Sequence, residues 1–528
     1  MRLFDRPGRS QVYSSEAMVA TSQPLASSVA LNILKKGGNA IDAAISAAAV
    51  LAVVEPTDTG IGGDCFVLYA PNGKSSPFAF NGSGRSPKNL SLNILEQLNL
   101  KDIPDQSAHA VTIPGAIDAW WQLHEKFGKL EFEELFIPAI NYAEEGYPVH
   151  ERLSSHWGKN LHRLNNLGDA KSIFLKDNSN PKKGERVFNL QLAKSLKIIS
   201  KKGRKGFYEG EIAEKTVKFL NQIGGKHTLE DFYSHKGNFV NPISSNYRNN
   251  TVFQLPPNTQ GIITLIILKI LNYLNLSSHS FYSAERIHIL TEVSKIGYFL
   301  RNQFLGDLEY SDKILEIFND ENMLMNFSKK VLPGYANYDF KNNMKLSSDT
   351  IYLTVIDKDK NIVSFINSIF EPFGSGLVPP ETGIILQNRG KSFNTNINHP
   401  NCIAPSKKPM HTIIPGMMSD EHKIQLSFGV MGGDYQPMGN CNLLSGLVDH
   451  ELTIQEVLDA PRFLPTNGLL DIERSLSNDV ENKLKSWGHN INYCDDPLGG
   501  GQAISINWKD GIISGGSDPR KDGCAIGY

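Results

Sequence analysis

The pattern of this sequence changes at Thr350. Before it, long stretches carry apolar residues at helical spacing, as in 24–36 and 39–54. After it, short runs rich in β-branched and aromatic residues alternate with turns, a pattern typical of strands. The runs expected to form strands are 350–357, 362–369, 383–388, 424–430, 503–508 and 511–514. A helical first part followed by a β-rich last part indicates an α+β fold, with layered sheets and helices outside them.

Two stretches of the first part have distinct compositions. The helix expected at 39–54 is apolar on nearly all faces, so it is predicted to be buried. Residues 311–345 are rich in Lys, Asn and Asp, and we expect an exposed connector there.

The composition excludes several classes of protein. The 528 residues carry a formal charge of −2, and this lack of a basic surplus argues against binding to nucleic acid or to an anionic membrane. The longest apolar run, 43–54, is too short to span a bilayer, and no secretory signal opens the chain. Five scattered cysteines form no Cys-x-x-Cys pair, which predicts neither a zinc site nor a disulfide framework. We therefore expect a soluble cytoplasmic protein.

No common cofactor motif is present. The chain lacks a His-Glu-x-x-His sequence, a phosphate-binding P-loop and a Gly-x-Ser-x-Gly elbow. We predict no metal ion and no organic cofactor.

Thr350 offers a catalytic possibility. If the Asp349–Thr350 bond is cut, the Thr350 hydroxyl becomes a nucleophile and its own α-amine the base. An N-terminal α-amine has a pKa of about 7.7–8.0, so it accepts a proton near neutral pH. A threonine that opens a strand is also an ordinary β-former, so this residue alone does not decide between the two interpretations.

Seven sequence blocks decide it. They are spread along almost the whole chain, in the order 37–44 (GGNAIDAA), 59–64 (TGIGGD), 111–115 (VTIPG), 255–261 (LPPNTQG), 350–359 (TIYLTVIDKD), 459–463 (DAPRF) and 515–520 (GGSDPR). On these blocks, the chain resembles the γ-glutamyltransferase (glutathione hydrolase) family of N-terminal-nucleophile hydrolases.

The resemblance implies a fold and a maturation step. The fold would be the four-layer αββα sandwich of this superfamily. The chain would be a proenzyme that cuts itself between Asp349 and Thr350, giving a large subunit, 1–349, and a small subunit, 350–528. Whether the processed heterodimer of these two subunits assembles further into a dimer stays open.

The resemblance also assigns catalytic roles. Thr350 matches the family nucleophile, and Ser368 stands where the family has a threonine whose hydroxyl bonds that nucleophile. Gly432 and Gly433 match the glycine pair whose N–H groups form the oxyanion hole. Glycine suits that task because it lets the backbone approach an anionic intermediate closely.

The residues that would hold a γ-glutamyl group differ from the family pattern. The family uses an Arg and a Ser-Ser pair for the α-carboxylate, and an Asn, a Gln and an acidic residue for the α-ammonium. The corresponding positions here are Ser83 (with Arg85 two residues on), His411-Thr412, Phe370, Arg389 and Ser392. The lid segment, 392–409, also looks shortened.

This exchange changes the expected charge of the substrate. The acidic partner of an ammonium group is lost, and Arg389 would repel one. Arg389 and Arg85 instead suggest an anionic acyl group, because guanidinium binds carboxylate through a planar fork. His411 and Thr412 are expected to line the pocket, without a proton-transfer role for the histidine.

Three functional hypotheses follow. The first is a self-processing γ-glutamyltransferase-like amidohydrolase or acyltransferase, which cleaves a γ-glutamyl (glutathione-type) amide through a threonyl acyl-enzyme. The second is an amidohydrolase of a small non-amino acyl amide, of the oxamate or dicarboxyl-acyl type. The third is an uncleaved, catalytically silent scaffold.

Overall fold

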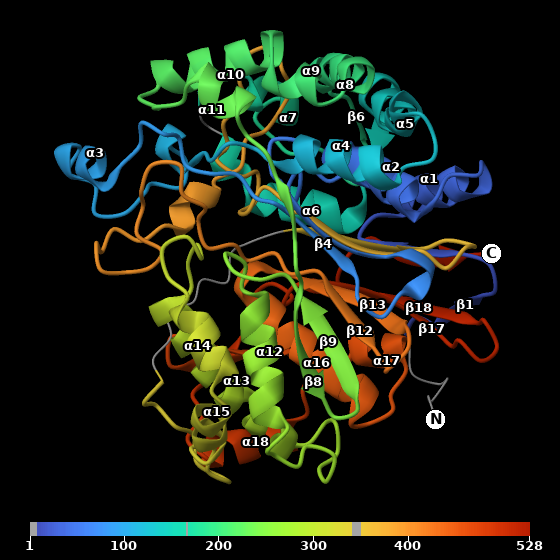
Figure 1. Ribbon diagram of the computed structural model, residues 1–528, viewed down its shortest axis with the longest axis vertical. Coiled ribbons are helices and arrows are strands. Elements are labelled where there is room, and N and C mark those ends of the chain that lie inside the picture. Colours follow the sequence, from blue (N-terminus) through green and yellow to red (C-terminus); the bar gives the residue numbers. More distant parts are fainter. Residues whose placement is uncertain (1–7, 165–166, 341–349) are drawn as a thin grey trace.

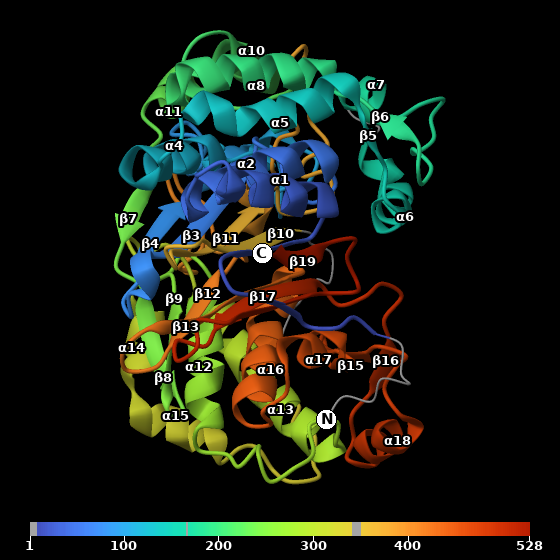
Figure 2. The same ribbon diagram turned by 90° about the vertical axis from the view of Figure 1, so that its right-hand side faces the viewer.

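The computed structural model describes residues 8–164, 167–340 and 350–528. Two seven-stranded sheets lie face to face at its centre, and helices cover the outer face of each (Figures 1 and 2). The predicted four-layer αββα sandwich is therefore confirmed.

The two sheets interleave segments from both parts of the sequence. The first sheet has the strand order β1 (Val12–Ser14), β18 (Ile513–Ser517), β17 (Gly500–Ile506), β13 (Ile424–Met431), β12 (Gly416–Ser419), β9 (Asn250–Gln254) and β8 (Ile243–Tyr247). The second sheet has the order β19 (Cys524–Gly527), β2 (Met18–Thr21), β10 (Ile351–Ile356), β11 (Ile362–Ser368), β3 (Asp64–Ala70), β4 (Phe78–Gly82) and β7 (Asn238–Val240). Smaller sheets are formed by β14 (Phe463–Thr466), β15 (Leu469–Ile472) and β16 (Ile491–Tyr493), and by β5 (Tyr147–Pro148) and β6 (Arg186–Val187).

The helices fall into two groups along the chain. Those on the side of the second sheet are α1 (Pro24–Lys35), α2 (Ala40–Val54), α3 (Leu92–Gln97), α4 (Ala116–Phe127), α5 (Phe132–Glu145), α6 (Glu151–Lys159), α7 (Ala170–Phe174), α8 (Leu190–Lys202), α9 (Arg204–Tyr208), α10 (Glu211–Gln222) and α11 (Leu229–Tyr233). Those on the side of the first sheet are α12 (Gly261–Leu271), α13 (Ala284–Phe304), α14 (Lys313–Asn319), α15 (Glu321–Ser328), α16 (Gln436–Val448), α17 (Ile454–Asp459) and α18 (Asn478–Ser486).

Strand β10 illustrates why the layers form. Its side chains alternate between two apolar environments, as the two-residue period of a strand requires. Tyr352 and Ile356 lie in the core between the sheets, whereas Leu353 and Val355 lie in the core shared with the outer helices. Because both faces are covered, the whole strand is buried. This places the residue that precedes β10, Thr350, in the interior.

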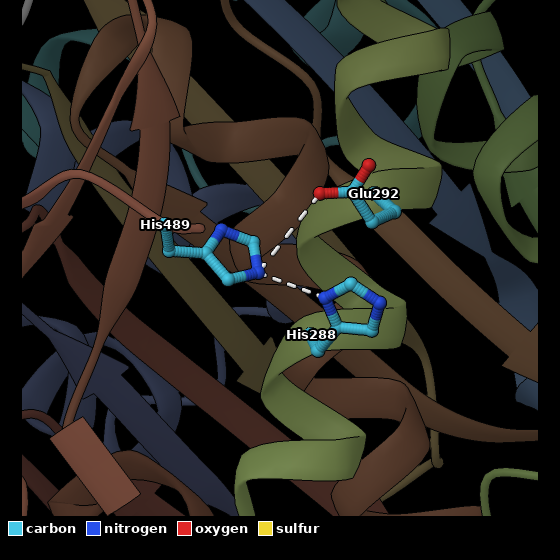
Figure 3. A group of neighbouring side chains, drawn as sticks. All are labelled: His288, Glu292 and His489. Atoms are coloured by element: carbon cyan, nitrogen blue, oxygen red, sulfur yellow. Dashed lines mark hydrogen bonds and ion pairs between the residues drawn. The ribbon is translucent and has the colours of Figure 1, made fainter. Parts of the chain in front are cut away.

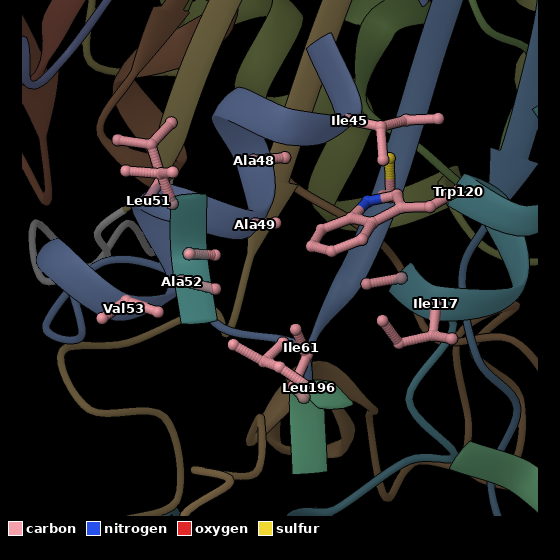
Figure 4. Close-up of a cluster of buried hydrophobic side chains, with 14 of the residues drawn as sticks. Ile45, Ala48, Ala49, Leu51, Ala52, Val53, Ile61, Ile117, Trp120 and Leu196 are labelled. Carbon is pink, nitrogen blue, oxygen red and sulfur yellow. The ribbon is translucent and has the colours of Figure 1, made fainter. Parts of the chain in front are cut away.

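Helix α2 is the centre of the helical layer next to the second sheet. Every one of its residues is buried, as its apolar composition predicts. Small alanines alternate with larger side chains there, and Trp120 and Ile117 of α4 pack against the same cluster (Figure 4). Asn39 caps the helix through a reciprocal capping box with Asp42, so the expected helix begins where the sequence suggests.

Two predictions about the fold are wrong. Residues 383–388 form no strand, because the segment bonds to loop residues such as Leu377 and Gly62 instead of to a sheet. Residues 311–345 are not simply a connector: they include α14 and α15, whose apolar sides are buried in the helical layer of the first sheet. Residues 341–345 lie outside the described residues.

Among the described residues, no helix is both long enough and apolar enough to cross a bilayer.

Candidate active site

Thr350 lies at the start of β10, beside the end of β11. The two strands pair antiparallel, with Ile351 opposite Asn367, so Thr350 comes level with Ser368. The Oγ1 atom of Thr350 is 3.0 Å from the Oγ atom of Ser368, and both residues are fully buried. Ser368 Oγ also accepts a hydrogen bond of 2.9 Å from the N–H of Phe370. The structure thus joins the two hydroxyl groups that the sequence assigned to one site.

The predicted cleavage junction is only partly described. Thr350 is described, whereas Asp349 lies outside the described residues. Cleavage there, and the resulting division into 1–349 and 350–528, stay predictions.

The glycine pair lies in the turn between β13 and α16. Gly432 and Gly433 have φ angles of 110° and 53°, in the left-handed region that favours glycine. A Cβ atom on Gly432 would lie 2.7 Å from the Cα atom of Gly499. The side chain of Gln260 donates to the carbonyl oxygen of Gly433 at 2.9 Å and to that of Thr412 at 2.8 Å. One amide therefore fixes the glycine turn against the predicted pocket residues.

Arg389 is the unusual charged group of the site. It is fully buried, and its guanidinium lies 3.7 Å from the ring centroid of Phe370. Its Nη1 atom donates to Thr412 Oγ1 at 3.0 Å, but its Nε and Nη2 atoms have no hydrogen-bond partner in the described part of the chain. Burial lowers the pKa of Arg389 to about 9, although nearby carboxylates such as Asp64 oppose the shift. Unsatisfied buried donors are costly, so this geometry favours an anionic ligand.

Two of the carboxylates near Arg389, Glu371 and Asp434, are already paired with other cations. Glu371 accepts from Arg163 at 3.0 Å and from Lys391 at 2.6 Å. Asp434 accepts from Arg301 at 2.6 Å. Neither of these acids is therefore available to hold a substrate ammonium group without giving up an existing ion pair.

Asp64 and His411 form a buried pair at the edge of the second sheet. Asp64 lies opposite Ser368 in the register of β3 and β11, and its Oδ2 atom is 3.1 Å from His411 Nε2. Burial, together with the charges of Arg389 and Lys408, holds the pKa of His411 well below its usual range, so the neutral ring donates to the carboxylate. Burial raises the pKa of Asp64 to about 6.

The other oxygen of Asp64 organises the surrounding loops. Its Oδ1 atom accepts hydrogen bonds from the N–H groups of Gly84 and Gly115, each at 3.0 Å, and from Gln387 Nε2 at 2.9 Å. The Asp64–His411 pair is thus held by several elements at once. This supports a positioning role for His411, in line with its predicted place in the pocket lining.

Arg85 lies in a different environment from Arg389. About a third of its side chain is exposed (35%), and its Nη2 atom is 2.7 Å from Glu309 Oε1. Its Nη1 atom donates to the carbonyl oxygen of Ser406 at 2.8 Å and lies 3.7 Å from Asp307 Oδ2. Within the described residues, no hydrogen bond joins Arg85 to Arg389 or to the hydroxyl pair.

Two residues that organise the site had no assigned role in the sequence interpretation. Asp64 ends the glycine-rich block 59–64, and Gln260 lies in the block 255–261, so both belonged to segments that the resemblance had already marked. Their position within those blocks was the sequence signal that could have identified them as site residues. Their roles depend on contacts with distant segments, which the blocks alone do not give.

A cavity of about 700 Å³ opens on the other side of the glycine turn. Gly432 and Tyr435 line it, together with residues of both parts of the chain such as Glu55, His156 and Lys521. Thr350 and Arg389 do not line this cavity, and both are fully buried.

Comparison with known proteins identifies the class that this fold and site define. The family model for γ-glutamyltranspeptidase matches residues 26–528. The chain belongs to the γ-glutamyltranspeptidase family, and it is an enzyme of a class whose members are hydrolases and transferases.

Three known proteins are similar to this chain over almost its whole length. The glutathione hydrolase-like YwrD proenzyme of Bacillus subtilis is 35% identical, covering 98% of this chain and 99% of the relative. The oxamate amidohydrolase proenzyme of Klebsiella pneumoniae is 30% identical, with coverage of 98% and 99%. The crystal structure of a cephalosporin acylase from Bacillus halodurans superposes with a TM-score of 0.92 at 34% identity, covering 100% of this chain and 99% of that one.

Proposed function

We propose that this protein is a self-processing N-terminal threonine amidohydrolase whose acyl donor carries a carboxylate and lacks an α-ammonium group. Oxamate and the monoamides of dicarboxylic acids, such as glutaryl amides, have this chemistry. The observation that carries the proposal is the buried guanidinium of Arg389, which has two donors without a partner in the described residues.

The chemical step would begin once Thr350 is an N-terminus. Its α-amine takes the proton of Oγ1, and the oxygen attacks the amide carbonyl carbon. The N–H groups of Gly432 and Gly433 would stabilise the oxyanion of the tetrahedral intermediate. The intermediate expels the amine, which takes up the proton, and leaves an ester on Thr350. Water then hydrolyses this ester and releases the carboxylic acid. Ser368, 3.0 Å away, would orient the attacking hydroxyl.

Arg389 would set the choice of acyl group. Its Nε and Nη2 atoms form one edge of the guanidinium fork, which matches the two oxygens of a carboxylate. Phe370 stacks on the guanidinium and Thr412 holds its other edge, so the fork is already oriented. A carboxylate there would satisfy both unused donors and neutralise a buried charge.

An α-ammonium group would find no unengaged acid among the described neighbours of Arg389. Asp64 already accepts hydrogen bonds from His411 and from the loops around it. Glu371 already forms ion pairs with Arg163 and Lys391. Asp434 already forms an ion pair with Arg301. The charge of Arg389 would repel the ammonium at short range. Because an unpaired buried charge costs several kcal/mol, the pocket disfavours amino-acyl donors.

Similarity to an oxamate amidohydrolase and to a cephalosporin acylase supports this choice. The second candidate is hydrolysis or transfer of a γ-glutamyl group, which would place the protein in glutathione metabolism. It is supported by the glutathione hydrolase-like relative at 35% identity.

A matched set of three anilides separates the candidates. Glutaryl anilide differs from γ-glutamyl anilide only by the missing α-ammonium group, and valeryl anilide also lacks the carboxylate. We expect kcat/KM for the glutaryl donor to exceed that for the γ-glutamyl donor by about 100-fold, equal to about 2.7 kcal/mol. We expect kcat/KM for the valeryl donor to be about as low as that for the γ-glutamyl donor. A preference for the γ-glutamyl donor would overturn the proposed acyl choice, and equal rates for glutaryl and valeryl would remove the role of Arg389.

A further inference from the structure

A second group of chemically active side chains lies outside the site described above. His288 and Glu292 stand one turn apart on α13, and His489 lies in the loop between α18 and β16 (Figure 3). All three are buried. His288 is separated from His489 by 201 residues in the sequence, so only the fold brings the histidines together.

The cluster is distant from Thr350. Arg301, which contacts the predicted active site through Gln260 and Asp434, lies on the same helix as His288. The helical rise over the intervening residues is about 20 Å. The proposed chemistry at Thr350 therefore does not use these histidines.

The three side chains face one another. His288 Nδ1 is 2.8 Å from His489 Nε2, and His489 Nε2 is 4.0 Å from Glu292 Oε1. One ligand atom from each residue lies within 4.8 Å of the other two. Figure 3 shows both rings and the carboxylate directed toward a common point. Two imidazoles and a carboxylate are a donor set that suits zinc and related divalent metals.

Backbone contacts prepare two of these groups as ligands. His288 Nε2 is 2.9 Å from the carbonyl oxygen of Leu332, which can only accept, so the proton is on Nε2 and Nδ1 presents its lone pair. Glu292 Oε2 accepts from the N–H of Asn337 at 3.0 Å, which directs Oε1 toward His489. This pattern of a ligating histidine held by a backbone carbonyl is common around metal ions.

One cation already contacts the cluster. Lys295 Nζ donates to Glu292 Oε1 at 2.7 Å and to the carbonyl oxygen of Asn337 at 3.1 Å. Without a metal ion, Lys295 neutralises the buried carboxylate. With one, it would keep only its bond to Asn337.

We propose that His288, Glu292 and His489 bind one divalent transition-metal ion, with Zn²⁺ as the expected species. The ion would take His288 Nδ1, His489 Nε2 and Glu292 Oε1, and the proton of His489 Nε2 would move to the other ring nitrogen. The site joins α13 to the loop before β16. It would thereby link the segments on either side of the predicted cut at Thr350.

Metal content and affinity test this site directly. Purified full-length protein would be stripped with a chelator, dialysed and titrated with Zn²⁺ alone against a competing indicator. We expect one tight equivalent per chain and a rise in the thermal midpoint with Zn²⁺. Co²⁺ at the same site should give visible absorption bands. The absence of a tight equivalent would overturn the proposal.

Variants identify the ligands. His489→Asn and the isosteric Glu292→Gln should each weaken Zn²⁺ binding by at least about 100-fold. His422→Gln, at an exposed histidine of the turn between β12 and β13, should leave the affinity unchanged. Equal affinity in wild type and both ligand variants would contradict the assignment.

Lys295→Met should change the affinity for Zn²⁺ in the opposite direction from the two ligand variants. Removing the competing cation should strengthen Zn²⁺ binding severalfold and destabilise the metal-free protein, because Glu292 loses its partner. If the cluster is only a hydrogen-bonded network, this variant would be destabilised and Zn²⁺ would not restore its thermal midpoint. That result would overturn the proposal even if His489→Asn failed to fold.

Discussion

The nucleophile region and the arginine pocket lie next to each other but are built from different chemistry. The nucleophile region consists of Thr350, Ser368 and the Gly432-Gly433 turn, and it contains hydroxyls and peptide groups without a formal charge. The arginine pocket is centred on Arg389, a buried cation with unused donors. Under the proposed function, bond cleavage and acyl choice would therefore rest on separate groups. Substitutions in one region should therefore leave the function of the other recognisable.

The largest effect is expected in the nucleophile region. Gly432→Ala would place a Cβ atom 2.7 Å from the Cα atom of Gly499 and displace the predicted oxyanion donors. We expect kcat to fall by about 10²–10³-fold for charged and uncharged donors alike. Steady-state kinetics with glutaryl and valeryl anilides measure this. Gly468→Ala is the matched control, because Gly468 also has positive φ but open space around it. A loss confined to the glutaryl donor would contradict the separation of the two regions.

The next largest effect is expected at Asp64, whose buried carboxyl group should make the free energy of unfolding depend on pH. The pKa of Asp64 is raised from 3.8 to about 6, so its contribution to stability is fully present below about pH 4 and is lost as the pH rises through about 6. Relative to Asp64→Asn, the unfolding free energy of the parent should fall by about 3 kcal/mol over this range. Urea unfolding in a Thr350→Ala background, kept as one chain, measures it. If the unfolding free energy of the parent instead rose with pH relative to Asp64→Asn, the conclusion that burial raises the pKa of Asp64 would be contradicted.

Removing the cation of the pocket should give a selective effect. Arg389→Met keeps the length of the side chain but removes its charge and its fork. We expect kcat/KM for glutaryl anilide to fall by about 100-fold, while valeryl anilide keeps its rate. Arg389→Lys should recover part of the loss, because it restores the charge without the paired donors. An equal loss on both donors would mean that Arg389 supports the fold instead of binding the acyl group.

The smallest effect is expected at the second arginine. The Arg85 side chain is about one-third exposed and already bonded to Glu309, so Arg85→Ala removes a surface ion pair worth less than about 1 kcal/mol. Rates on glutaryl and valeryl anilides should both stay within about five-fold of the parent. A loss specific to the glutaryl donor would instead place Arg85 in substrate binding.

Local signals in the sequence were sufficient for several elements. The strands at 350–357 and 362–369 were expected, and the short segment between them closes a local turn, in which Asp357 accepts hydrogen bonds from Asn361 and Asp359. The buried helix α2 was expected because apolar residues cover its whole surface. Such features depend on neighbours along the chain, so a single sequence can predict them.

Other features depend on contacts between distant segments. The apolar run at 383–388 is buried as a strand would be, but its hydrogen bonds go to loops, which apolar pattern alone cannot distinguish. The sequence suggested both Arg85 and Arg389 as carboxylate binders. In the structure Glu309 forms an ion pair with Arg85, whereas among the described residues Arg389 hydrogen-bonds the Thr412 hydroxyl and keeps two donors without a partner. The pairing of His288 with His489 likewise has no local signal.

The central claim is that Thr350 becomes an N-terminal nucleophile, and intact mass spectrometry under denaturing conditions tests it most directly. The account predicts two fragments from freshly purified protein, 1–349 and 350–528, and a single chain from Thr350→Ala. Incubation with glutaryl anilide and rapid acid quenching should add a glutaryl group to the fragment that begins with Thr350. A single intact, unlabelled chain from the parent protein, or cleavage that persists in Thr350→Ala, would contradict the account.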